Sequence, residues 1–210
     1  MRRLAPLASM LVALVVALAV ALPAAAQREA QYRAWCLERS TDEQTIEGCS
    51  ALIAAGSENV ENLFRAYNNR GAAYAMSGDY KRAIEDATEA LKLQPGEFVV
   101  WTSRCHSRAV VGDLQAALAD CNEALRLAPS TPTSLHIRGF VLLKLGRFDD
   151  AIADYDASLK IYAKSAIALY GRGVAKRKKG DVAGGDADIA AAKAIRPDVA
   201  DLMAKWGVSP

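Results

Sequence analysis

Apolar residues recur at intervals of three and four positions through most of the chain that follows residue 62. Between Tyr67 and Met76, and again between Tyr80 and Leu93, this spacing places the apolar side chains along one face of an α-helix. Gly78 and Asp79 separate the two stretches. A glycine readily takes the left-handed conformation that ends a helix, and an aspartate can cap the next one. The pattern therefore predicts two short amphipathic helices joined by a tight turn.

This helical hairpin is repeated with a period of 34 residues. The turn glycine recurs in register, and so do a small residue in the second helix and a proline at its end. These positions are Gly78, Gly112, Gly146 and Gly180; Ala83, Ala117, Ala151 and Gly185; and Pro95, Pro129 and Pro197, with Ala163 in the third copy. One short hairpin cannot bury its apolar face alone, so successive copies must stack into a curved solenoid.

The repeated unit resembles the tetratricopeptide repeat, in which small residues lie where the two helices cross and a proline ends the second helix. The resemblance extends over about residues 65–197. It implies an all-α fold, an α-solenoid whose four helix-turn-helix units occupy residues 63–197, divided into 64–97, 98–131, 132–165 and 166–197. Residues 27–62 are expected to form an imperfect leading hairpin and a link. Residues 198–210 are expected to form a capping helix and tail, with Trp206 in the core.

Each repeat carries an arginine beside the position where the helices cross and an aspartate sixteen residues later. In an antiparallel hairpin these two positions lie roughly level, which predicts ion pairs that hold helix against helix. The expected pairs are Arg70–Asp86, Arg104–Asp120, Arg138–Asp154 and Arg172–Asp188. The alternative is a ladder of arginines that binds an anionic ligand, but the matching aspartates favour structural pairs.

The chain has four cysteines. Cys36 and Cys49 lie on the two arms of the expected leading hairpin, whereas Cys105 and Cys121 are expected to face each other across the second repeat. Disulfides Cys36–Cys49 and Cys105–Cys121 are therefore predicted for an oxidising compartment. Buried free thiols are the alternative. A redox-active pair is disfavoured because no C-x-x-C sequence is present.

The first 26 residues have the layout of a secretory signal peptide. Arg2 and Arg3 precede an uncharged run from Leu4 to Ala26, which closes on small residues. This layout predicts cleavage before Gln27, export to the periplasm or secretion, and no membrane span in the mature protein. The alternative is a retained membrane anchor, since the run is long enough to cross a bilayer.

Composition limits the classes of function. With 26 basic and 24 acidic residues, the net charge of +2 is far from the basic excess that favours nucleic-acid binding. Two histidines provide little for a metal site, and we find no carboxylate pair on the first helices for acid–base catalysis. We therefore expect no enzyme, no cofactor and no metal. An enzyme that uses carboxylates in the groove is the less favoured alternative.

In tetratricopeptide proteins the first helices line a concave groove, and the resemblance implies that this groove binds a protein or peptide partner. A second copy of the chain would fit the same surface as readily as a different protein. The side chains expected to point into the groove are Asn68, Asn69, Ala72, Thr102, His106, His136, Phe140, Tyr170 and Val174, with Arg177 and Lys178 at the far end.

The resemblance implies a scaffold of exported bacterial type, acting in cell-envelope assembly or secretion. The alternative is a carrier of a small ligand or a metal that uses His106 and His136.

Overall fold

The structure is a computed structural model that describes residues 23–38 and 40–210. These residues form α-helices and no strand. The helices are α1 (Ala24–Leu37), α2 (Asp42–Ala55), α3 (Val60–Met76), α4 (Tyr80–Leu93), α5 (Phe98–Val111), α6 (Leu114–Leu127), α7 (Pro132–Lys144), α8 (Phe148–Ile161), α9 (Ala166–Lys178), α10 (Val182–Ile195) and α11 (Val199–Lys205). The predicted signal peptide lies outside the described residues except for residues 23–26, where α1 begins.

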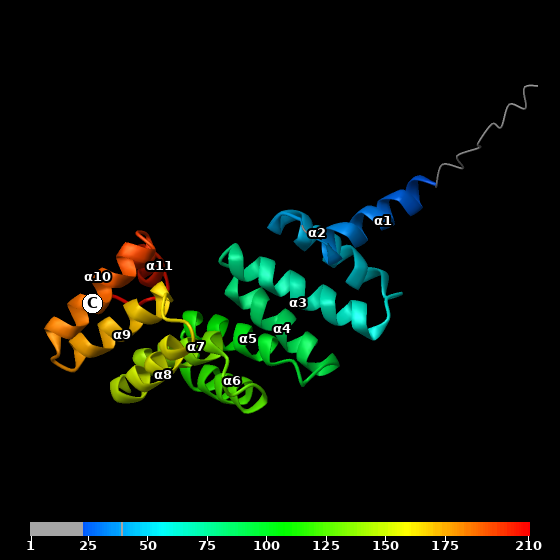
Figure 1. Ribbon diagram of the computed structural model, residues 1–210. Helices are drawn as coiled ribbons and strands as arrows, with labels where there is room; N and C mark the ends of the chain where they lie inside the picture. Colours follow the sequence, from blue (N-terminus) through cyan, green and yellow to red (C-terminus); the bar gives the residue numbers. More distant parts are fainter. Residues whose placement is uncertain (1–22, 39) are drawn as a thin grey trace, which may run out of the picture.

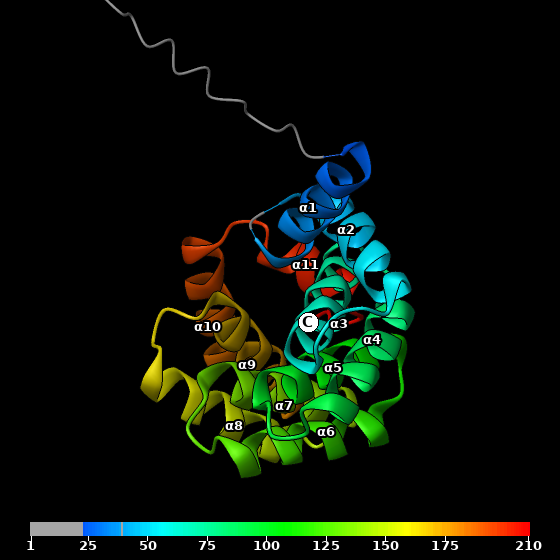
Figure 2. The same ribbon diagram turned by 90° about the vertical axis from the view of Figure 1, so that its right-hand side faces the viewer.

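Consecutive helices from α1 to α10 pair as hairpins, and each hairpin packs against the next (Figure 1). The view turned by 90° shows that the stack curves and that α11 lies on its inner side (Figure 2). The all-α solenoid predicted from the 34-residue period is confirmed. The concave face, lined by α3, α5, α7 and α9, is the inner side of this curve.

The turns within the four central hairpins depend on glycine. Gly78, Gly112, Gly146 and Gly180 have φ angles between 74° and 96°, a region that side chains with a Cβ rarely adopt. Two of the following helices are capped by an aspartate, because Asp79 and Asp181 accept a hydrogen bond from the backbone N–H three residues on. The helices α6 and α8 begin without such a bond.

Each repeat arginine contacts two neighbouring hairpins. Arg104 donates from Nε and Nη2 to both carboxylate oxygens of Asp120, at 2.9 and 2.8 Å, and from Nη1 to Thr88 Oγ1 of the preceding repeat, at 3.1 Å. The same bidentate geometry occurs in Arg70–Asp86, Arg138–Asp154 and Arg172–Asp188. The third bond of these arginines goes to Ser50, Asn122 and Asp156 respectively. The arginines therefore link repeat to repeat as well as helix to helix.

Hydrogen bonding and burial shift the pKa values of these groups. The bond to the partner aspartate raises the pKa of Arg70, Arg138 and Arg172 above the ordinary arginine value. Burial acts to raise the pKa of Asp188, but hydrogen bonds from Arg172 and Lys176 bring it below its ordinary value. A guanidinium that already bonds two residues has few N–H donors left for a ligand, which favours structural pairs over an anion-binding ladder.

The crossing of the two helices differs among the repeats. In the third repeat Gly139 packs against the ring of Tyr155, which is fully buried and also fills the space beside Gly171. In the second repeat the corresponding positions hold Cys105 and Cys121, which form a buried disulfide. A covalent bond thus occupies the place of the glycine–tyrosine contact.

A second disulfide, Cys36–Cys49, joins α1 to α2. All four cysteines are paired in the structure. The described residues before α3 therefore form a cross-linked helical hairpin at the start of the stack.

The C-terminal segment turns back onto the concave face. α11 packs against α9 and α10, and its Val199 and Met203 are fully buried. The backbone N–H of Val208 donates to the Met203 carbonyl, and Gly207 takes a φ of 80°, which is the turn that commonly ends a helix. This turn directs residues 206–210, the tail, across the inner side of the curve.

Candidate functional site

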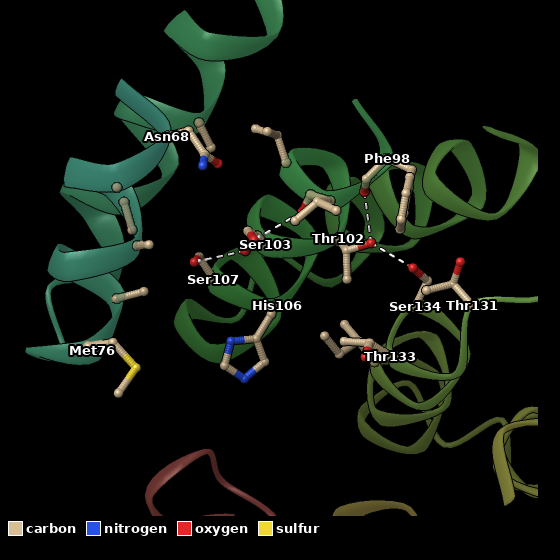
Figure 3. Close-up of a pocket in the computed structure, with 18 residues that line it drawn as sticks. Asn68, Met76, Phe98, Thr102, Ser103, His106, Ser107, Thr131, Thr133 and Ser134 are labelled. Carbon is tan, nitrogen blue, oxygen red and sulfur yellow. Dashed lines mark hydrogen bonds between the residues drawn. The ribbon is translucent and has the colours of Figure 1, made fainter. Parts of the chain in front are cut away.

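A cleft of about 480 Å³ opens on the concave face between α3, α5 and the start of α7. Figure 3 shows this α3–α5 cleft, with the side chains of α3 on one side and those of α5 and α7 on the other. Its lining consists of Asn68, Gly71, Ala72, Ala75, Met76, Ala83, Ala87, Phe98, Val99, Val100, Thr102, Ser103, His106, Ser107, Thr131, Thr133, Ser134 and Ile137.

The inner hydroxyl groups of the cleft are already hydrogen-bonded within the protein (Figure 3). Thr102 donates to the Phe98 carbonyl at 2.9 Å and shares a bond of 2.7 Å with the Ser134 hydroxyl. Ser103 and Ser107 donate to backbone carbonyls of α5, each at 3.0 Å. No charged side chain contributes to the lining. The cleft therefore presents a mainly apolar surface with few free polar groups.

Exposed apolar side chains border the cleft on both sides. Met76 of α3 is 77% exposed and Val99 of α5 is 51% exposed. Large apolar side chains that face solvent around a concave surface are typical of a binding site.

Four aromatic rings lie together beside the cleft. We call Tyr80, His106, Phe140 and Trp206 the aromatic cluster. The His106 ring lies 4.6 Å from Trp206, 5.9 Å from Phe140 and 6.0 Å from Tyr80, measured between ring centroids. The indole N–H of Trp206 donates to the Tyr80 hydroxyl at 3.2 Å. The cluster joins the first repeat to the tail.

Lys144 of α7 binds the backbone of the tail at Trp206. Its Nζ donates to the Ala109 carbonyl at 2.7 Å and to the Trp206 carbonyl at 3.1 Å. Burial lowers the pKa of Lys144 below the ordinary lysine value. The backbone position of Trp206 is thus tied to α5 through one lysine side chain.

Both histidines lie beside the aromatic cluster and are neutral at pH 7. Burial lowers the pKa of His106 to about 4, and repulsion from Lys144, and from His136 when that ring is protonated, adds to the shift. Burial also lowers the pKa of His136 to about 4. The two imidazoles line a shared cavity with Trp206, but across residues 23–38 and 40–210 no group of three or more metal-binding side chains is assembled.

The structure brings four of the groove residues expected from the sequence together in the cleft and buries three others. Asn68, Ala72, Thr102 and His106 line the α3–α5 cleft. Phe140, Tyr170 and Val174 differ from the expectation, because each is at most 2% exposed and belongs to the buried core. The reason is that α11 and the tail pack over this part of the concave face, where an open groove was expected.

The remaining expected residues have other neighbours. The Asn69 amide donates to the Cys36 carbonyl at 2.8 Å and so ties α3 to α1. Arg177 pairs with Asp186 of α10. Lys178 lies beside a cavity of about 540 Å³ that Val174 and the tail also line. The basic end of the expected groove is therefore separate from the α3–α5 cleft.

Some site residues were missing from the sequence-based set. Ser103 and Val99 lie one and two turns before His106 on α5, so helical periodicity alone would have placed them on the same face. Trp206, which is expected in the core from the sequence, is partly buried and packs against the edge of the core. No local pattern linked Tyr80, Lys144 or Trp206 to the site, because their contacts join distant parts of the chain.

The fold and its concave face define a class of protein, the helical repeat proteins that act as interaction scaffolds. Family models described as tetratricopeptide repeat match residues 64–97 and residues 138–200. The chain is a tetratricopeptide-repeat protein.

Solved structures agree with this family. The chain resembles MamA 41-end from Desulfovibrio magneticus RS-1, with a TM-score of 0.66 and 17% identity over 85% of this chain and 98% of that one. A tetratricopeptide repeat protein from Parabacteroides merdae ATCC 43184 has a TM-score of 0.66 and 19% identity, over 86% of this chain and 73% of that one. At these identities the likeness concerns the fold alone. A search of curated protein sequences finds no significant match.

Within the part of the chain that the structure describes, no helix has both the length and the apolar character needed to cross a bilayer.

Proposed function

We propose that the protein is an interaction scaffold that binds an apolar segment of a partner protein in the α3–α5 cleft. The observation that carries this proposal is the combination of an apolar lining, internally bonded hydroxyls and exposed Met76 and Val99 at its border. The tetratricopeptide fold supports it, since proteins with this fold bind partners through their concave face.

The chemistry of the cleft defines the kind of partner. Its lining contains no charge, so binding gains come from apolar burial more than from ion pairs. A volume of about 480 Å³ is enough for a few apolar side chains of one peptide segment. The amide of Asn68 at one wall and the imidazole of His106 at another are the polar groups that can orient the bound backbone.

We also propose that the protein acts outside the cytosol, in the periplasm or after secretion, as a component of cell-envelope assembly or secretion. Two buried disulfides support an oxidising compartment, and the signal-peptide layout of residues 1–26 supports export.

Site-specific photo-cross-linking tests the proposed site. A photoreactive residue at Ser103, which is exposed in the cleft, should capture a partner from an extract of the compartment in which the protein resides. The same residue at Lys160, which is exposed on α8, serves as the control and should capture nothing specific.

A pair of matched substitutions adds a second test. Val99→Asp places a carboxylate in the apolar cleft and should lower the cross-linking yield at Ser103 at least tenfold. Val182→Asp changes a valine with the same exposure, 51%, on α10 and should leave the yield unchanged. Equal yields from the two variants would show that partners bind elsewhere. Circular dichroism should report the same helix content for both.

A further inference from the structure

The tail occupies the direct continuation of the α3–α5 cleft. His106 and Ile137 line the cleft on one side and a smaller cavity beside Trp206 on the other. Figure 3 shows the His106 ring between Met76 and Thr133, at the side of the cleft that faces the C-terminal segment. A segment that follows α5 and α7 beyond the cleft would therefore meet Trp206.

The packing around Trp206 is looser than that of the core. A cavity of about 130 Å³ remains between its indole and His106, His136, Ile137, Phe140 and Ile167. Trp206 itself is only partly buried, and Gly207, Ser209 and Pro210 are exposed. This hollow is partly open to solvent, and the indole does not fill it.

The backbone bonds of the tail all go to α11, whereas its contacts with the concave face come from a few side chains. Trp206 is held by the Tyr80 hydroxyl, the Lys144 ammonium and the rings of His106 and Phe140. Val208 is the one buried residue of the tail. By contrast, α11 is anchored by the fully buried Val199 and Met203. The anchors of α11, the cap of the stack, are therefore separate from those of the tail.

We propose that the tail is an internal ligand of the concave face, and that a partner segment entering through the α3–α5 cleft displaces it. The recognised chemistry is a tryptophan followed by glycine and an aliphatic residue, as in Trp206-Gly207-Val208. This inference rests on the proposed function, because the competitor of the tail is the partner segment proposed there. The binding of the tail to the concave face does not depend on that proposal. A tethered ligand competes at high effective concentration, so the tail sets a threshold for partner binding.

A peptide supplied in trans tests the proposal on the full chain. The probe is a fluorescent peptide with the sequence of residues 205–210, Lys-Trp-Gly-Val-Ser-Pro. It should bind the double variant Trp206→Ala/Val208→Ala, in which both anchors of the tail are removed, at least tenfold more tightly than it binds the wild type. The same peptide with alanine in place of tryptophan should bind neither. Trp101→Ala is the control variant, because its indole bonds the Pro95 carbonyl outside the aromatic cluster. It should bind the probe no better than the wild type.

Equal binding to all three proteins, or no binding to the double variant, would overturn the proposal. If the double variant fails to fold, hydrogen exchange on the wild type decides. The amides of residues 206–208 should exchange at least tenfold faster than those of α7 and α9. Exchange as slow as that of α7 and α9 would show that the tail does not leave the concave face. Cross-linking at Ser103 is independent of these readouts, so failure of the partner site and failure of the tail proposal are distinguishable.

Discussion

At the scale of single residues, the repeat arginines show how one side chain can serve two interfaces. Each forms a bidentate pair within its hairpin and a third bond to the hairpin before it. A guanidinium suits this role because its five N–H donors have a fixed fork geometry, which a lysine lacks. Asp120 is also bonded by Arg108, at 2.7 Å, so two guanidinium groups depend on one buried carboxylate.

Asp120→Asn should therefore be strongly destabilising. The amide keeps the shape of the carboxylate but leaves two arginines, Arg104 and Arg108, without their counter-charge. Breaking a buried ion pair in this way typically costs about 3–5 kcal/mol. Urea denaturation followed by circular dichroism measures the loss. Asp150→Asn, in the exposed pair with Arg147, is the control and should change the free energy of unfolding little. Equal effects of the two variants would contradict a special role for the buried pair.

The two histidines predict a loss of stability in mild acid. Their pKa values are about 4 in the folded chain, below the ordinary value of 6.5. Below pH 6.5 the unfolded chain binds protons that the folded chain does not, so the free energy of unfolding falls as the pH decreases towards 4. The expected loss is about 1–3 kcal/mol for each histidine.

Urea denaturation at pH 7, 6, 5 and 4.5 checks this dependence. Carboxylates whose folded pKa is lowered, such as Asp188, add a loss of their own at the acid end, because their unfolded forms begin to take up protons near pH 5. A variant without the histidines separates the two contributions. The variant His106→Gln/His136→Gln should show a flatter profile between pH 6.5 and 4.5. A profile as steep as that of the wild type would assign the effect to other groups.

At the scale of helices and hairpins, the disulfides reinforce elements that pack differently. Cys105–Cys121 lies inside the stack, with neighbouring repeats on both sides, whereas Cys36–Cys49 joins the leading hairpin at the end of the array. A terminal hairpin packs on one side only and opens more easily than an internal one.

Replacing Cys36 and Cys49 by alanine should loosen α1 and α2 without unfolding the rest. The disulfide closes a loop of thirteen residues, which corresponds to about 3 kcal/mol in the unfolded chain. Hydrogen exchange should increase in α1 and α2 and stay unchanged in α7 to α9. Replacing Cys105 and Cys121 instead should lower the stability of the whole stack. Identical exchange patterns in the two variants would contradict this distinction.

The hairpins could be predicted from the sequence because their determinants are local. A turn glycine, a helical apolar stripe and a fixed period require no knowledge of distant contacts. The spacing of sixteen between Arg104 and Asp120 reflects the geometry of one hairpin, and the structure forms that pair. The third bond, from Arg104 to Thr88, depends on how two repeats are rotated against each other, which periodicity does not encode.

At the scale of the whole molecule, the position of the tail could not be read from the sequence. Trp206 meets Tyr80, which lies 126 positions earlier, because small rotations between repeats add up to a curve that brings the two together. The expected groove residues Phe140, Tyr170 and Val174 became core for the same reason. Residues 206–210 do not contribute to the lining of the α3–α5 cleft.

Trp206→Ala should also change the overall shape. The bond between Trp206 and Tyr80 connects the first central repeat to the C-terminal segment across the inner side of the curve. Without it the curve can relax, so small-angle X-ray scattering should give a larger radius of gyration than for the wild type. Trp101→Ala should leave the radius unchanged. An unchanged radius in both variants would show that the packing between repeats alone sets the curvature.

The arginine bonds between repeats have a consequence for how long such an array can be. Arg104 and Arg138 each bond the residue sixteen positions before them. In a duplicated copy of residues 98–131, inserted after residue 131, the arginine would meet Asn122 of the original copy, which is the acceptor that Arg138 uses now, and Arg138 would meet the asparagine of the inserted copy. The arginine bonds between repeats are therefore compatible with an additional repeat. The contact of Trp206 with Tyr80 is not compatible with one, because an additional repeat would move Trp206 away from Tyr80. The hydrogen bond between Trp206 and Tyr80 thus depends on the number of repeats between them, whereas the bonds of the arginines do not.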